Sequence, residues 1–287
     1  MRRSARVDPD DRGDVGRGRV VFSPRNAAWF ATMVAGAFWA ALFERTVAGI
    51  ALFAASTAFV LLFGHSLGSH RKLVHDAFDC PRWLERALVY AGVLVGLAGP
   101  LGLLRQHELR DHAQRRPDCH PYLCHASGWL RDAYWQLACE LRLERPPLIT
   151  LERRIADDPF YAWLERTWRW QQVPVALLLF ACGGLSWVLW GVSARVTAGV
   201  AGHWIIGYLA HNHGQMRYRV PGAAVQGRNV RLVSLLTMGE CWHNNHHAFP
   251  DSARLGLEPG QWDPGWWVLL GLRRAGVVTR LRLPDGR

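Results

Sequence analysis

The chain has 287 residues, of which half are hydrophobic and 15 are tryptophan, and its formal net charge is +11. A positive charge of this size is compatible with nucleic-acid binding, but the arginines are dispersed among apolar segments without a recognisable nucleic-acid motif. We therefore exclude a nucleic-acid partner and expect the charge to face the anionic surface of a membrane.

The chain begins with a polar segment, residues 1–25, that carries both charge signs together with Gly and Pro, which predicts a mobile basic tail. Long uncharged runs follow, and most of them are strongly apolar: 26–43, 46–69, 87–104, 171–194 and 196–216. About twenty apolar residues are enough for a helix to cross a bilayer. The chain is therefore predicted to be an integral membrane protein.

Four of the runs form two hairpins, because the connections near Glu44–Arg45 and near Arg195 are very short. The tail, the stretch 71–170 and the C-terminal part 217–287 then share one side of the membrane. That side holds nearly all Lys and Arg, which makes it cytoplasmic by the positive-inside rule. We predict a multi-pass protein with both termini in the cytoplasm.

The remaining run, 87–104, contains four glycines and Pro100. If it crossed the bilayer, the histidines before and after it would lie on opposite sides, so we interpret it as a buried or half-inserted helix. The expected fold is an all-α integral membrane fold with four transmembrane helices and a cytoplasmic helical cap. Residues 26–255 form the membrane domain, and 256–287 form a C-terminal cytoplasmic segment.

All 13 histidines lie between His65 and His247, and nearly all follow the cytoplasmic ends of apolar runs. The second run leads into "GHSLGSHRKLVHDAF", which contains His70 and His75. On an α-helix these two are about 140° apart, so they straddle a face and could bind different metals of a pair. An isolated pair would also suit ordinary polar residues at a membrane interface.

The next cluster is "RQHELRDHAQRRPDCHPYLCH". His107 and Asp111 share one helical face and can point at one ion. His112 lies off that face unless the helix is distorted. His120 and His125 are expected in a loop, either as ligands or as solvent-exposed polar residues.

The last long run ends in "GHWIIGYLAHNHG". His211 is expected at its cytoplasmic end, and His203 about 12 Å deeper by helical rise. An imidazole at that depth must face protein or a cavity, so His203 either lines a substrate path or is a hydrogen-bonded structural residue.

The strongest local signal is "GECWHNNHHAFP", where His243, His246 and His247 crowd one side of a helix. Three adjacent imidazoles need a metal or a hydrogen-bond network to share. Together the clusters offer seven to nine nitrogen and oxygen ligands and no placed cysteine, which excludes a structural zinc and favours two non-haem iron ions with open positions for O2.

The sequence resembles the membrane fatty acid desaturase superfamily, and most of all its acyl-CoA (stearoyl-type, delta-9-like) members. The motifs are "HRKLVH", "AGP" followed by "HELRD", "AHNHG" and "GECWHNNHHAFP", which come in family order and cover roughly residues 28–255. The resemblance implies four transmembrane helices below a cytoplasmic cap with two irons. The metal ligands it implies, together with the two open alternatives at the second box, are His70, His75, His107, Asp111 or His112, His211, His243, His246 and His247.

Two positions depart from the family pattern. The second box usually ends in a histidine pair, but this chain has Arg110 and Asp111 there and His112 one place later. The asparagine usually found four residues before the fourth-span histidine is Gly207. Either Asp111 or His112 replaces the missing imidazole.

The resemblance implies O2-dependent introduction of a cis double bond into a fatty acyl chain carried by CoA, an acyl carrier or a lipid. No dinucleotide fingerprint or ferredoxin cysteine set is visible, so electrons must come from a separate donor. We expect a ferredoxin or a cytochrome b5-like protein that docks on the basic cytoplasmic surface. No catalytic residue beyond the metal ligands is expected. The alternatives are a membrane di-iron hydroxylase or monooxygenase of lipids and a non-catalytic lipid-binding pseudoenzyme.

Overall fold

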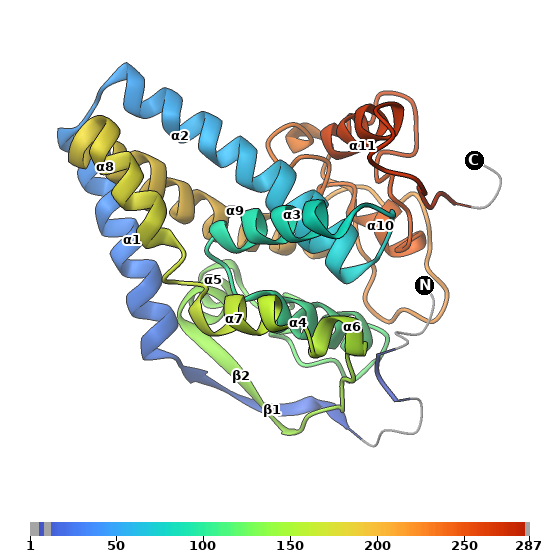
Figure 1. Cartoon of the computed structure of the whole chain (residues 1–287). Coiled ribbons are helices and arrows are strands. Elements are labelled where there is room, and N and C mark those ends of the chain that lie inside the picture. Colours follow the sequence, from blue (N-terminus) through green and yellow to red (C-terminus); the bar gives the residue numbers. More distant parts are fainter. Residues whose placement is uncertain (1–5, 9–12, 285–287) are drawn as a thin grey trace.

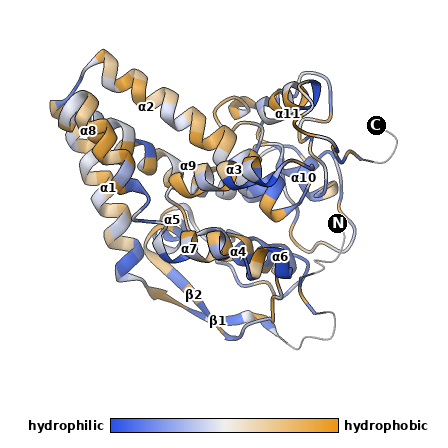
Figure 2. Cartoon of the chain, viewed as in Figure 1, coloured by the Kyte–Doolittle hydropathy of each residue, from blue (hydrophilic) through white to orange (hydrophobic). Residues whose placement is uncertain are grey.

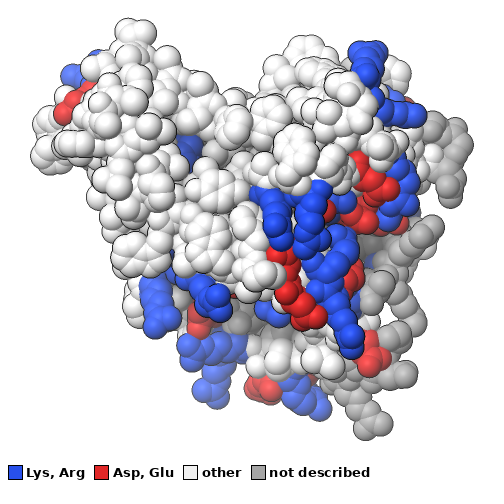
Figure 3. Space-filling view, viewed as in Figure 1, with Lys and Arg blue, Asp and Glu red and all other residues white. Residues whose placement is uncertain are grey.

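The computed structural model describes residues 6–8 and 13–284 and is mostly helical. Long helices extend to the left of Figure 1, and shorter helices, loops and a two-stranded ribbon form a second body to the right and below. Hydrophobic residues dominate the long helices (Figure 2), whereas charged side chains gather on the second body (Figure 3). We call this second part the polar body, because a lipid environment suits only the first.

The first hairpin agrees with the sequence prediction. Helix α1, Pro24–Phe43, is followed after three residues by α2, Val47–Phe59, which continues as the π-helix η1, Val60–Val74. Large apolar side chains on the hairpin are exposed, such as Phe38 at 65% and Val47 at 86%. By length and composition, three helical segments are able to cross a membrane: 24–43, 47–74 and 172–212.

The second hairpin turns at a different place from the one predicted. Helix α8, Gln172–Val188, runs through η2, Leu189–Ala194, into α9, Arg195–Asn212. The backbone leaves helical geometry only at Gly183 and Gly184, where Gly184 has φ 65°. A Cβ on Gly191 would lie 2.5 Å from Leu179, so the chain reverses between these two residues.

The predicted connection near Arg195 is therefore wrong. Arg195 is helical and 1% exposed, and its guanidinium donates to the carbonyl of Gly191 and to Oε1 of Gln172. The charge suggested a loop, but it is satisfied inside the helix pair. Since 172–182 rises only about 17 Å at 1.5 Å per residue, the long arm of this hairpin is 185–212.

The run 87–104 is not the single buried or half-inserted helix that we expected, because it is divided between two helices. Neither of them is among the segments able to cross a membrane. Helix α3, Arg82–Leu94, ends before a turn, and α4, Pro100–Ala113, begins at the proline. Helix α3 packs tightly on η1: a Cβ on Gly68 would lie 2.2 Å from the carbonyl oxygen of Leu88. The glycines of η1 thus let the two backbones touch.

Part of the predicted mobile tail is ordered, which corrects that prediction. Strand β1, Asp14–Phe22, pairs antiparallel with β2, Cys139–Arg145, and this ribbon was not predicted in an all-α fold. Gly18 lies against the carbonyl of Arg142, where a Cβ would be 2.8 Å away, so glycine is needed for the close approach. Residues 1–5 and 9–12 of the predicted tail lie outside the described residues.

The polar body is built from short elements around a core of Leu, Ile, Val and Tyr side chains. Its helices are α5 Trp129–Ala138, α6 Arg153–Ala156, α7 Pro159–Thr167, η3 Arg231–Val233, α10 His243–Ala248 and α11 Pro264–Arg274. Helix α10 lies beside η1, α4 and α9 (Figure 1). This is where the histidine clusters meet.

Candidate metal centre

Four imidazoles from three segments form the first of two histidine groups. Each offers one nitrogen within 4.8 Å of the nitrogens of the others. The Nε2 atoms of His70 and His246 are 3.3 Å apart, and the rings of His75 and His107 have centroids 4.9 Å apart. We call this set group one: His70, His75, His107 and His246.

His70 and His75 belong to the same group, which corrects the expectation that they would serve different metals. The reason is the π-helix: the amide of His75 donates to the carbonyl of His70, an i to i+5 hydrogen bond of 3.1 Å. In this geometry five residues make about one turn, whereas on an α-helix they would diverge by about 140°. The bulge thus brings both imidazoles to one point.

Group two contains three imidazoles, His211, His243 and His247. The Nε2 atom of His243 lies 3.1 Å from that of His211 and 2.9 Å from that of His247. Helix α10 therefore contributes to both groups, with His243 and His247 on one side and His246 on the other.

The two asparagines of "HNNHH" fix helix α10 in place. Asn244 and Asn245 are 0% and 1% exposed. The side-chain oxygen of Asn244 accepts from the amides of Arg217 and Tyr218, both at 2.7 Å. Asn245 donates to the carbonyl of Leu255 and accepts from the side chain of Asn229. Because these amides hold both flanks, the imidazoles beside them have little freedom.

The two groups fit metal ions. Two ligand nitrogens at about 2.1 Å from one ion, at angles of 90–109°, are about 3.0–3.4 Å apart. Two of the Nε2 pairs above, at 3.3 and 3.1 Å, have this spacing, and the third, at 2.9 Å, is slightly closer. Burial, then neighbouring imidazoles, lowers the pKa of His243, His246 and His247 well below the usual value. Neutral imidazoles are the form that binds metals. The Nε2 atom of His75 is buried without a hydrogen-bonding partner, as a vacant ligand atom would be.

The carboxylate of Glu240, which was not predicted as a site residue, fixes the orientation of the His70 imidazole. Oε2 of Glu240 lies 2.5 Å from Nδ1 of His70, which leaves Nε2 to face group one. Burial would raise the pKa of Glu240, but the neighbouring His70 and then Arg71 lower it overall. A carboxylate behind a ligating imidazole fixes its orientation and raises its basicity. The available signal was the "GE" directly before the third box.

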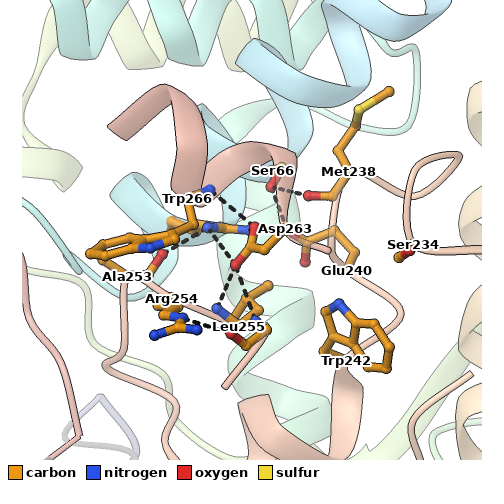
Figure 4. A network of polar contacts seen from close by, with 12 residues as sticks. Ser66, Ser234, Met238, Glu240, Trp242, Ala253, Arg254, Leu255, Asp263 and Trp266 are labelled. Atoms are coloured by element: carbon orange, nitrogen blue, oxygen red, sulfur yellow. Dashed lines mark hydrogen bonds and ion pairs between the residues drawn. The ribbon is translucent and has the colours of Figure 1, made fainter. Parts of the chain in front are cut away.

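A buried network next to this carboxylate joins the third box to helix α11 (Figure 4). Ser66 donates to Glu240, and Arg71 forms an ion pair of 2.6 Å with Asp263. Asp263 also accepts from the amides of Leu255, Gly256 and Trp266. Since Arg71 directly follows His70, the network anchors the backbone that carries a group-one ligand.

The two candidates for the missing second-box imidazole lie outside both groups. Oδ2 of Asp111 is 3.6 Å from Nδ1 of His107, and Asp111 belongs to neither group. Burial, then Glu108, raises the pKa of this carboxyl to about 7. His112 is half-buried and belongs to neither group. Direct ligation by Asp111 or His112 stays a prediction.

Arg110 lies outside both histidine groups and contacts His125, whose role the sequence did not decide. Its guanidinium donates to the carbonyl of Leu123 and to Oε1 of Gln136, and lies 3.2 Å from Nε2 of His125. His125 is buried, its Nδ1 lies 2.9 Å from Oδ2 of Asp132, and its ring stacks on that of His211 at 5.7 Å. His125 therefore supports group two from behind and is not solvent-exposed.

Gly207 explains how His125 fits. A Cβ at this position would lie 3.0 Å from Nε2 of His125, so the imidazole fills the space in which a larger residue would need to stand. Glycine at position 207, where the family usually has asparagine, therefore leaves room for the imidazole of His125.

A family model for fatty acid desaturases matches residues 47–257, which include every histidine of both groups. The chain belongs to this family. It is 34% identical over 223 residues to the sn-1 stearoyl-lipid 9-desaturase of Anabaena variabilis, a match that covers 77% of this chain and 79% of the relative. It is 33% identical over 224 residues to the sn-2 palmitoyl-lipid 9-desaturase of Nostoc sp. (strain 36), with 76% of each chain covered.

More distant members of the fatty acid desaturase family are also similar. An acyl-CoA 5-desaturase of Anemone leveillei is 28% identical over 249 residues, which covers 87% of this chain and 73% of that protein. The family resemblance inferred from the histidine boxes is therefore confirmed, and this family member is an oxidoreductase of the desaturase type.

Proposed function

We propose that this desaturase uses two non-haem iron ions and O2 to introduce a cis double bond into a fatty acyl chain. The observation that carries the proposal is the pair of histidine groups, which lie where the apolar helices meet the polar body. Helix α10 contributes imidazoles to both groups. In the proposed assignment group one holds one ion and group two the other. Asp111 acts behind His107, since the carboxylate faces its Nδ1.

The irons would supply the activation of O2, and the residues supply position and environment. Glu240 orients His70, the ring of His125 stacks on that of His211, and the side-chain amide of Gln114 lies 3.2 Å from Nε2 of His211, beside His243. The neutral state of the imidazoles leaves their nitrogens free for the ions. The apolar helices would give the acyl chain a route to the metal centre. Catalysis then requires that the reacting carbons of the acyl chain are held beside the two groups.

A cleft of about 590 Å³ lies behind the third box, and we propose that it binds the polar carrier of the acyl chain. Its lining includes Arg217, Arg231 and Trp242, the residue before His243, and also Glu258, whose carboxylate lies 4.0 Å from the guanidinium of Arg217. Two guanidinium groups suit the phosphate of a lipid headgroup or of CoA. Both kinds of carrier occur among the relatives, since two are named for lipid-linked chains and one for acyl-CoA.

The proposed orientation places the polar body in the cytoplasm, with both ends of the chain on that side. The support is the distribution of basic residues, which gather on the polar body in Figure 3. A surface of this kind would also receive an acidic ferredoxin or a cytochrome b5-like donor.

The deciding experiment is lipid profiling of a host with and without the gene. We expect new monounsaturated chains two hydrogens lighter than their precursors. Chains that gain one oxygen and lose no hydrogen would establish the hydroxylase alternative instead. An unchanged profile, with clearly less than two irons per purified chain after reconstitution, would establish the pseudoenzyme.

Histidine variants connect the product to the proposed centre. His243→Ala should abolish the new product and remove the ion of group two, so that about one iron per chain remains. The matched control is His213→Ala, because His213 is exposed and belongs to neither group. Full activity of His243→Ala would refute the metal assignment.

A further inference from the structure

Two histidines below the metal groups are used by neither of them. The rings of His65 and His203 contact each other edge to face, with centroids 5.0 Å apart. His65 also stacks on the group-one ligand His70 at 6.4 Å. The pair therefore joins η1 to α9 next to the metal centre, and its members belong to two of the three segments able to cross the membrane.

The side of α9 that carries His203 faces the interior of the protein. Gly199, four residues earlier, packs against Val95, and Gly207, four residues later, packs against His125. His211, a further turn on, belongs to group two. Residues spaced by four share a helical face, so His203 points the same way. Its side chain is nevertheless exposed, so protein atoms do not fill all of the space beside it.

Neither imidazole is satisfied by the protein. Within the described part of the chain, the structure records ring contacts for His65 and His203 but no hydrogen bond or ion pair. Each neutral imidazole carries one N–H donor and one nitrogen acceptor. Polar side chains inside a membrane segment normally face a functional partner, because lipid offers them none.

We propose that His65 and His203 form a polar subsite that binds a hydroxyl group carried on the acyl chain near the reacting carbons. This inference rests on the proposed function, since it places the subsite on the path of that chain. A hydroxyl can accept from one imidazole and donate to the other, which matches a facing pair. A plain methylene at this point would leave all four nitrogen functions of the pair without partners.

The subsite predicts which chains bind best. A site built to hydrogen-bond a hydroxyl discriminates strongly against the analogue that lacks it. One positional isomer of monohydroxystearate, with its hydroxyl at the depth of the pair, should bind about 10-fold or more tighter than stearate. The other isomers should bind no better than stearate.

The test uses the full chain, loaded with iron in detergent micelles, without an electron donor, so that binding is measured free of turnover. Stearate and a series of monohydroxystearates are titrated, with tryptophan fluorescence as the signal. His65→Leu and His203→Leu should each remove the preference for the favoured isomer while stearate binds as before. His213→Leu should keep the preference.

The outcomes separate the subsite from the proposed function. Equal or undetectable binding of all hydroxy isomers to the unaltered chain overturns the subsite and means that water satisfies the two imidazoles; this result needs no variant to fold. Desaturation of unsubstituted chains, measured separately, reports on the proposed function. A hydroxyl preference without any desaturation would support the subsite and refute the proposed function.

Discussion

Replacing Asp263 by asparagine tests whether the buried network of Figure 4 holds the third histidine box in place. The side chains of Asp263 and Arg71 are 2% and 1% exposed and 2.6 Å apart. Asp263→Asn removes the charge that Arg71 needs. The oxygen of the new amide can still accept on one side. Its NH2 group replaces the other oxygen and then faces either the amides of Leu255 and Gly256 or the amide of Trp266, from which it cannot accept.

The expected loss follows from the burial of both partners. Breaking one side of a buried ion pair costs about 3–5 kcal/mol, because the remaining charge has no water to solvate it. For a chain of this size each kcal/mol lowers the unfolding midpoint by about 2–4 °C, so a decrease on the order of 10 °C is expected. The double variant Arg71→Met with Asp263→Asn should recover part of this loss, because it removes the stranded cation.

The assay is thermal unfolding of detergent-solubilised protein, followed by tryptophan fluorescence, together with iron content. Asp79→Asn is the matched control, since the side chains of Asp79 and Arg280 are 43% and 53% exposed and such pairs contribute less than about 1 kcal/mol. If Asp263→Asn and Asp79→Asn have the same unfolding midpoint, the network does not stabilise the third histidine box and the prediction is refuted.

Three further predictions concern the centre itself. His243→Ala should lower iron binding at group two about 100- to 1,000-fold, and iron titration measures it. The magnitude assumes that each ligand contributes roughly a quarter of the 10–16 kcal/mol typical of a four-ligand zinc site, or about 2.5–4 kcal/mol. The metal-free protein should lose stability as the pH falls below about 6.5, by up to about 1.4 kcal/mol per pH unit for each histidine involved. The histidines are His243, His246 and His247, whose pKa is lowered by burial, so the unfolded chain takes up protons that the folded chain excludes. Gly207→Asn should destabilise by about 1–3 kcal/mol, because it displaces His125, and thermal unfolding measures the loss.

Each of these has a clear contrary result. Two tightly bound irons in His243→Ala would mean that group two is not a metal site. A metal-free protein equally stable at about pH 7.5 and about pH 5.5 would contradict the burial of neutral imidazoles. An unchanged melting point for Gly207→Asn would show that His125 moves freely, against its contacts with Asp132 and Arg110.

The sequence was sufficient to predict the histidine clusters and the first hairpin. The order and spacing of the histidine boxes predict His70, His107, His211 and His243 as site residues, and the two histidine groups contain all four. The turn near Glu44 was predicted because charge interrupts an otherwise apolar stretch, and α1 does end at Phe43.

Other features depended on contacts that no local pattern encodes. Arg195 has the charge typical of a turn, but partners on another segment satisfy it, and the reversal occurs at Gly183–Gly184, within an apolar run. The grouping of His70 with His75 required a π-helix, whereas the sequence reasoning assumed α-helical spacing. The ribbon of β1 was missed because its partner, β2, lies more than 100 residues away.

The short helix α10 takes one ligand to group one and two to group two, and the other ligands come from distant parts of the chain. His70 and His107 precede the second hairpin, whereas His211 ends it. Bound ions would therefore clamp the early and late parts of the polypeptide through a single helical turn, and their binding free energy would become tertiary stability. Chelation should then loosen the contact between η1 and α9 as a unit, so that loss of metal and loss of the acyl path occur together.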